Sequence, residues 1–153
     1  MQSSERCRNQ IMQWEGTKLS IYSDANGFPT VGIGHKLAPE EIALHAYVGG
    51  ITTGQAVILF DEDIARFDTL VNSLFVDGHL TQGQFDALVS FCYNEGFGRL
   101  RTMLSHGLAN VPNELPHWVY AGTTKLPGLV KRRAQEVAWW NEERLLTGNE
   151  VSW

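Results

Sequence analysis

The sequence predicts a mostly helical α+β fold, with a small β-hairpin lobe and a larger helical lobe joined by a long helix. Apolar residues repeat at helical spacing over residues 52–74, which is long enough to connect two lobes. Residues 19–33 instead alternate with a period of two around a turn signal. With 153 residues, 43% of them hydrophobic and 19% charged, we expect one domain over residues 1–153. Its small lobe covers about 15–51, and its helical lobe covers about 52–153 and includes the N-terminal helix.

A first helix is predicted from Ser4 to about Glu15, with Ser3 or Ser4 as its N-cap and Gly16 ending it. The apolar residues that carry this pattern are Cys7, Ile11, Met12 and Trp14. The C-terminal end of a helix carries partial negative charge, which favours the neutral form of a carboxyl group there. Glu15 is therefore predicted to be a proton donor.

A β-hairpin is predicted between Leu19 and Ile33, with its turn at Asn26-Gly27. Gly32 and Gly34 lack side chains and allow backbone or ligand to approach closely. Strands this short must pack on helices to be stable.

Helices account for most of the remaining chain. A short one is expected between Pro39 and Gly50, and capping boxes at Thr52–Gln55 and Thr81–Gln84 open two longer ones, the second ending near Gly96. Further helical segments are expected at 100–106, 113–121 and 129–146, the last ended by Gly148.

Composition argues against several classes of partner. The net charge of −5 disfavours nucleic acid, and the basic run at 131–133 is more often a solvated helix face than a binding patch. Cys7 and Cys92 form no zinc or disulfide pattern, and the five histidines show no metal-ligand spacing, so no metal or cofactor is expected. Residues 1–13 have no apolar core, so we expect neither a signal peptide nor membrane insertion, and synthesis in the cytoplasm.

Glu15, Asp24 and Thr30 form the candidate catalytic group. Taken singly, each is ordinary: a surface glutamate, a turn aspartate and a strand threonine. Together they place two carboxyl groups and a hydroxyl on a helix and the hairpin that follows it. Glycoside hydrolysis needs such a layout, because one carboxyl protonates the leaving oxygen while the other acts on the opposite face of the sugar.

These residues resemble the signature of a known family, the phage-type lysozymes of glycoside hydrolase family 24, which includes the T4 and P22 endolysins. The matching segments are Glu15-Gly16, Tyr22-Ser-Asp24, Gly27 and Thr30-Val-Gly32-Ile-Gly34-His35. The resemblance continues through Thr52, Asp63, the Gln84–Phe91 stretch, Asn94, Gly96 and the Gly128–Glu136 stretch, so it covers nearly the whole chain.

The resemblance implies a lysozyme-like fold and a monomeric endolysin that cleaves the β-1,4 bond between N-acetylmuramic acid and N-acetylglucosamine in peptidoglycan after release from the cytoplasm, for host-cell lysis. It implies that Glu15 is the general acid, that Asp24 is a base and that Thr30 helps to hold the water. T4-type members invert the anomeric centre.

Supporting and binding residues also follow from the resemblance. It implies that His35 forms a structural ion pair with Asp63 and that Arg132 lies beside Glu15. Tyr93 and Asn94 are implied to contact sugar in the cleft, although the end of a core helix is an equally good interpretation of both. Lys36 replaces an apolar cleft residue of the T4-type members, so it is a candidate substrate-binding residue that changes sugar contacts on that side.

Two other functions stay open. A lytic transglycosylase needs no base aspartate, which Asp24 and Thr30 argue against. A non-catalytic peptidoglycan-binding or assembly module would not need an intact acid, base and threonine. The net negative charge of the chain also differs from the net positive charge with which many endolysins reach anionic cell walls.

Overall fold

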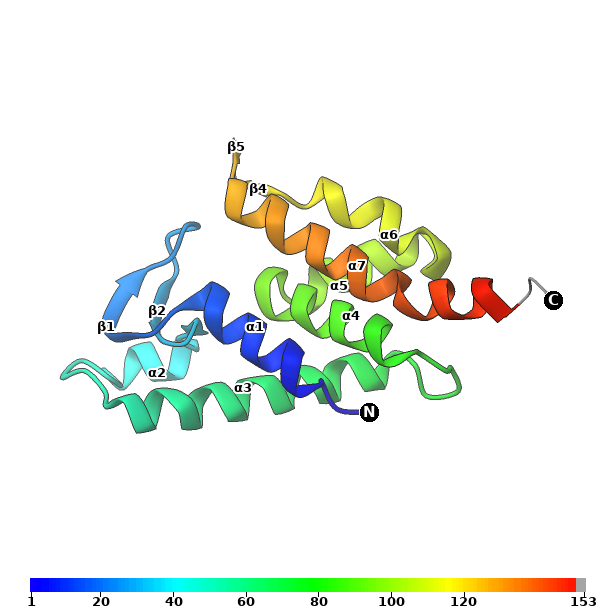
Figure 1. The fold of residues 1–153 in the computed structure, drawn as a ribbon. Helices are drawn as coiled ribbons and strands as arrows, with labels where there is room; N and C mark the ends of the chain where they lie inside the picture. The colour runs from blue at the N-terminus through cyan, green and yellow to red at the C-terminus, as the bar shows by residue number, and fades with distance from the viewer. Residues whose placement is uncertain (151–153) are drawn as a thin grey trace. The chain divides into compact units, whose positions relative to one another are not determined.

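Helices form most of residues 1–150, which this computed structural model describes with side chains as far as Glu142 (Figure 1). The α-helices are α1 (Glu5–Glu15), α2 (Pro39–Ala43), α3 (Thr53–Ser73), α4 (Gln82–Glu95), α5 (Phe97–Ser105), α6 (Val111–Glu114) and α7 (Pro127–Glu150), and the 3-10 helices are η1 (Leu108–Asn110) and η2 (Leu115–His117). The strands are β1 (Lys18–Ser23), β2 (Pro29–Gly32), β3 (His35–Lys36), β4 (Tyr120–Ala121) and β5 (Thr124–Lys125). The predicted mostly helical α+β class is confirmed.

Two compact units make up the chain. One is residues 8–66, here the smaller unit, and the other combines residues 1–7 with residues 67 onward, here the larger unit. Helices α1 and α3 each contribute residues to both units. The predicted single domain and its lobe limits stay a prediction.

An antiparallel sheet with strand order β1-β2-β3 lies in the smaller unit. The predicted hairpin is present, but its turn is wider than the Asn26-Gly27 pair. The Gly27 N–H donates to the Asp24 carbonyl at 2.9 Å, and the Asp24 N–H donates to the Phe28 carbonyl at 2.9 Å. Strand β3 was not predicted, because two residues are too few to show a periodicity.

The predicted short helix is α2, which begins at Pro39, where a missing N–H costs nothing. The loop after it contains two non-glycine residues with positive φ, His45 at 52° and Tyr47 at 65°. Its end is tied to the sheet, because the Ile51 N–H donates to the Leu19 carbonyl at 2.8 Å. The capping box predicted at Thr52 then opens α3.

Helix α4 is the buried centre of the larger unit, as its apolar sequence predicts. Its capping box is present, with the Gln84 N–H donating to Thr81 Oγ1 at 3.1 Å. Helix α7 runs alongside it (Figure 1). The two approach closely at Gly83, where a Cβ atom would lie 2.0 Å from the Trp139 carbonyl oxygen.

Three predicted helices have wrong boundaries. Helix α5 begins at Phe97 rather than at residue 100, and α7 extends from Pro127 to Glu150 rather than over 129–146, so it continues past Gly148. The helix predicted over 113–121 stops early, because Pro116 lies in η2 and a small β4–β5 hairpin follows. Gly122, with φ of 60°, forms the turn of that hairpin.

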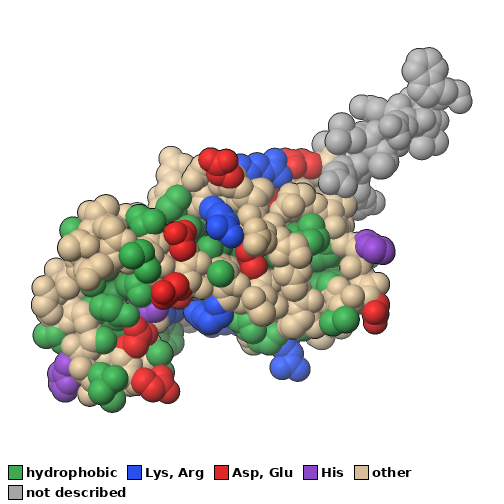
Figure 2. Space-filling view, turned by 90° about the horizontal axis from the view of Figure 1, so that it is seen from below, with side chains coloured by type: hydrophobic (Ala, Val, Ile, Leu, Met, Phe, Trp, Pro, Cys, Tyr) green, Lys and Arg blue, Asp and Glu red, His purple; other side chains and the backbone are tan. Residues whose placement is uncertain are grey.

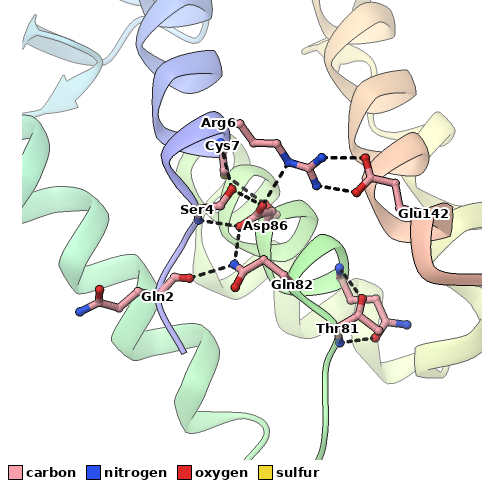
Figure 3. A network of polar contacts seen from close by, with 9 residues as sticks. Gln2, Ser4, Arg6, Cys7, Thr81, Gln82, Asp86 and Glu142 are labelled. Carbon is pink, nitrogen blue, oxygen red and sulfur yellow. Dashed lines mark hydrogen bonds and ion pairs between the residues drawn. The ribbon is translucent and has the colours of Figure 1, made fainter. Parts of the chain in front are cut away.

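The residues before α1 are held to α4 by a buried aspartate (Figure 3). Asp86, with no exposed surface, accepts from the Ser4 N–H at 2.9 Å and from the Ser4 hydroxyl at 2.5 Å. Gln82 donates to the same carboxylate at 2.9 Å. Arg6 lies 3.8 Å from it and pairs with Glu142. Ser4 is thus the N-cap of α1, one of the two predicted candidates.

Within the described part of the chain, no helix is both long and apolar enough to cross a membrane. Several apolar side chains are nevertheless exposed on α2, the following loop and the start of α3, namely Ile42, Leu44, Val48, Val57 and Ile58. Figure 2 shows hydrophobic side chains at the surface, interspersed with acidic ones.

Candidate active site

Glu15 is the last residue of α1, and its side chain packs against the backbone of Gly34. A Cβ atom on Gly34 would lie 2.7 Å from Glu15 Oε2 and 2.9 Å from its carboxyl carbon. Gly16, with φ of 66°, turns the chain directly after the helix. The carboxyl group thus lies against the turn between β2 and β3.

Asp24 is held by the turn that it opens. Its Oδ1 atom accepts two backbone hydrogen bonds, from Asn26 N–H at 2.9 Å and from Phe28 N–H at 2.8 Å. This is the usual way in which an aspartate stabilises a turn. Its Oδ2 atom lies 3.7 Å from Lys36 Nζ, and only 16% of its side chain is exposed.

Thr30 lies in the central strand and is 2% exposed. Its hydroxyl donates to the Phe28 carbonyl at 3.0 Å, which leaves the oxygen able to accept a hydrogen bond. Thr30 is directly opposite Tyr22 on β1 and Lys36 on β3. Because directly opposite residues point to the same face of a sheet, these three side chains form one row.

Tyr22 lies close to two carboxyl groups. Burial raises the pKa of the Tyr22 hydroxyl, and the Glu15 and Asp24 carboxylates raise it further. Both carboxylates are thus close enough to Tyr22 to disfavour a third negative charge. Tyr22 belongs to the matching Tyr22-Ser-Asp24 segment but was not predicted as a site residue. Its position in an alternating strand, two residues before Asp24, was the signal that could have identified it.

The predicted His35–Asp63 contact is present, with Nδ1 2.8 Å from Asp63 Oδ2. A second carboxylate, Glu41, lies 3.0 Å from Nε2. The hydrogen bond to Asp63 raises the pKa of His35, burial opposes this, and Glu41 adds to the rise. His35 therefore connects β3 to both α3 and α2.

Glu41 and Tyr47 were missed by sequence reasoning. Glu41 accepts the Ala38 N–H at 2.9 Å at the start of α2. Its place in the first turn of a helix that begins at Pro39 was the available signal. Burial of Glu41 opposes its ionisation, but hydrogen bonds from Tyr47, Ala38 and His35 outweigh this and lower its pKa. The bond to Glu41 in turn raises the pKa of Tyr47 to about 12.

The other predicted site residues lie in the larger unit. Arg132 is 4% exposed, donates to the Ser90 carbonyl at 3.2 Å and lies 3.7 Å from Glu136. Its predicted place beside Glu15 stays a prediction.

Tyr93 and Asn94 lie in the last turn of α4. Tyr93 is 6% exposed and packs on Phe67, with ring centroids 5.2 Å apart. The Asn94 side-chain oxygen accepts from Arg133 at 2.9 Å. These contacts explain both residues structurally, and their sugar contacts stay a prediction.

Comparisons with known proteins identify the family and the fold of the chain. Residues 12–136 match the family described as Phage lysozyme. The chain is 36% identical over 152 residues to the endolysin of Bacillus phage PZA, covering 92% of this chain and 55% of that protein. It therefore spans about half the length of that relative.

Solved structures are similar over nearly all of the chain. The endolysin of Escherichia coli O157:H7 phage FAHEc1 gives a TM-score of 0.70 at 28% identity and covers 94% of this chain and 95% of its own. A mutant P22 lysozyme gives 0.64 at 29% identity, with 92% and 98% covered. The lysozyme-like fold is thus confirmed, and the chain belongs to the phage lysozyme family.

Proposed function

We propose that this chain is a muramidase that hydrolyses the β-1,4 bond between N-acetylmuramic acid and N-acetylglucosamine in peptidoglycan, for host-cell lysis by a phage. Glu15 is the general acid, and Asp24 and Thr30 position and activate the water. The observation that carries the proposal is the placement of the three residues on one small sheet: Glu15 packs on its β2–β3 turn, Asp24 is held in its β1–β2 turn, and Thr30 lies in its central strand. Family membership and the relatives named endolysin support the substrate class.

Glu15 suits the role of acid because its position is fixed. It ends a helix and packs on Gly34, so its carboxyl group cannot shift toward that turn. General acid catalysis depends on such placement, since the proton donor must lie within hydrogen-bond reach of the leaving oxygen.

Asp24 and Thr30 offer two acceptors for one water. The Asp24 Oδ1 atom is engaged by backbone N–H groups, whereas Oδ2 faces a side chain. The Thr30 hydroxyl donates its hydrogen bond to the Phe28 carbonyl, so its oxygen is available to accept a hydrogen bond from a water. A water that donates to both oxygens turns its lone pair toward the sugar, which is the requirement for inversion.

Replacing the proton donor tests the assignment. We expect Glu15→Gln to lower kcat on purified peptidoglycan at least about 100-fold, with an unchanged far-ultraviolet circular dichroism spectrum. Glu5→Gln on the same helix is the matched control and should keep wild-type activity. Near wild-type turnover by Glu15→Gln would contradict the role of Glu15.

Product analysis tests the reaction itself. Mass spectrometry of the released muropeptides should find reducing N-acetylmuramic acid ends, and NMR of the fresh product should find the α-anomer first if the enzyme inverts. Anhydro-muramic ends would identify a lytic transglycosylase instead. Binding to peptidoglycan without any cleavage would identify a non-catalytic module.

A further inference from the structure

We propose that Lys36 is a positioning residue: it holds the Asp24 carboxylate through Oδ2 and so sets the direction in which Asp24 meets the water. This differs from the sugar-contact role that its place in the sequence suggested. The inference rests on the proposed function, since it specifies how one residue of that site is oriented.

The two oxygens of Asp24 have different partners. Oδ1 accepts the N–H groups of Asn26 and Phe28, at 2.9 and 2.8 Å. These two bonds restrain Oδ1 but leave the carboxylate able to rotate about that anchor. Oδ2 lies 3.7 Å from the Lys36 ammonium, which supplies a second point of restraint from another strand. Two restraints on opposite oxygens fix the plane of the group.

The Lys36 ammonium is itself held in place. Lys36 lies on β3 directly opposite Thr30, and the neighbouring Leu37 N–H donates to the Pro29 carbonyl at 3.0 Å. The ammonium also lies 5.4 Å from the centre of the Phe28 ring, within the range of a cation–π contact. Phe28 is 55% exposed, so the ring has the lysine side chain as a partner at the surface.

The distance of 3.7 Å matters for the chemistry. It is too long for a strong hydrogen bond, so Lys36 attracts Oδ2 without taking the lone pair that accepts from a water. The Lys36 side chain is 45% exposed, and ion pairs this exposed contribute little to stability. We therefore expect Lys36 to affect turnover and not the folded state.

The two roles of Lys36 predict different kinetics. A residue that binds sugar equally in the ground and transition states changes KM and leaves kcat unchanged. A residue that orients the group acting on the water changes kcat and leaves KM unchanged, because the water is activated only in the transition state.

The test compares Lys36→Met, Lys36→Arg and a matched control, Lys18→Met, on purified peptidoglycan. Lys18 also lies over an aromatic ring, 4.1 Å from that of Tyr22, but pairs with no carboxylate among the described side chains. We expect Lys36→Met to lower kcat about tenfold with KM within about twofold. Lys36→Arg should restore kcat to within about threefold of wild type, and Lys18→Met should leave it unchanged. A higher KM at constant kcat, or no effect, would overturn the proposal.

A second comparison asks whether Lys36 acts through Asp24. In an Asp24→Asn background, Lys36→Met should cause no further fall in kcat, because the charge that it orients is gone. A further tenfold fall would mean that Lys36 acts independently and would overturn the proposal.

A third measurement does not depend on turnover. NMR of Lys36→Met should shift the Asp24 carboxyl carbon and the Asn26 and Phe28 amides, whereas Lys18→Met should leave all three in place. Unshifted signals would overturn the Lys36 contact whether or not the protein cleaves peptidoglycan. If the wild-type protein does not cleave peptidoglycan but Lys36→Met still shifts these signals, the proposed function is wrong and the contact between Lys36 and Asp24 stands. The catalytic part of the inference would then be overturned.

Discussion

Gly34 has no side chain at the position where Glu15 packs, and its φ is 69°. A methyl group there would lie within 3.0 Å of three Glu15 side-chain atoms. We therefore predict that Gly34→Ala displaces the Glu15 carboxyl and lowers kcat about 100-fold. The positive φ should also cost about 1–2 kcal/mol of stability. Activity on purified peptidoglycan and urea unfolding measure the two effects.

Gly122→Ala is the matched control for that substitution. Gly122 has φ of 60°, and a Cβ atom there would meet nothing within 4 Å. It should therefore lose similar stability while keeping wild-type kcat. If Gly34→Ala were no less active than Gly122→Ala, the packing of Glu15 on the β2–β3 turn would be irrelevant to catalysis.

At the level of single residues, the signature predicted which residues form the candidate site but not the contacts that each of them makes. Glu15, Asp24 and Thr30 were predicted from residue types at a fixed spacing. In the structure, Glu15 packs on the β2–β3 turn, Asp24 opens the β1–β2 turn and Thr30 lies in β2. Lys36 was predicted to contact sugar because, by resemblance, it replaces an apolar cleft residue of the T4-type members. Its contact with Asp24 depends on the register that sets β3 against β2, and two residues carry no periodicity that reveals a register.

Among the secondary-structure elements, β3 is joined to α2 and α3 through His35. Because contact with Asp63 and Glu41 raises the pKa of His35 in the folded state, the ion pairs contribute fully below about pH 6.5. Their contribution is lost as the pH rises through the folded-state value. We predict that His35→Asn costs about 1–3 kcal/mol at pH 5.5 and clearly less at pH 9.

Urea unfolding at both pH values, compared with wild type, measures that difference. His79 is exposed, so His79→Asn serves as the control and should cost little at either pH. An effect of His35→Asn that is equal at pH 5.5 and pH 9 would show that its charge does not stabilise these contacts.

The packing of α4 on α7 depends on Gly83. A Cβ atom at this position would lie 2.0 Å from the Trp139 carbonyl oxygen, which is backbone and cannot rotate away. Gly83→Ala should therefore destabilise the protein by about 2–3 kcal/mol or more. This loss outweighs the gain expected from the higher helix propensity of alanine. Gly98→Ala in α5, where a Cβ atom meets nothing within 4 Å, should stabilise by up to about 1 kcal/mol. Thermal unfolding of both variants decides, and a neutral Gly83→Ala would contradict this packing.

Long helices that open with a capping box were predictable, whereas the strands of two residues were not. The capping boxes at Thr52 and Thr81 marked the starts of α3 and α4, because a cap depends on neighbouring residues alone. The segment predicted as a helix over 113–121 contains Pro116 and ends in the β4–β5 hairpin. Each of those strands has two residues, so tertiary packing decides their conformation and the local pattern does not.

At the scale of the whole molecule, the charge of −5 sets how the protein meets its proposed substrate. Peptide stems carry carboxylates, so peptidoglycan is anionic and the approach is repulsive at low salt. Raising NaCl from about 0.01 to 0.15 M shortens the screening length from about 30 to 8 Å. We therefore predict that KM on stem-bearing glycan falls as NaCl rises over this range, and that the same glycan without stems shows no such change. A KM that rises with salt would mean that local cations dominate the encounter, and the exposed Lys125 and Lys131 would be the first to replace.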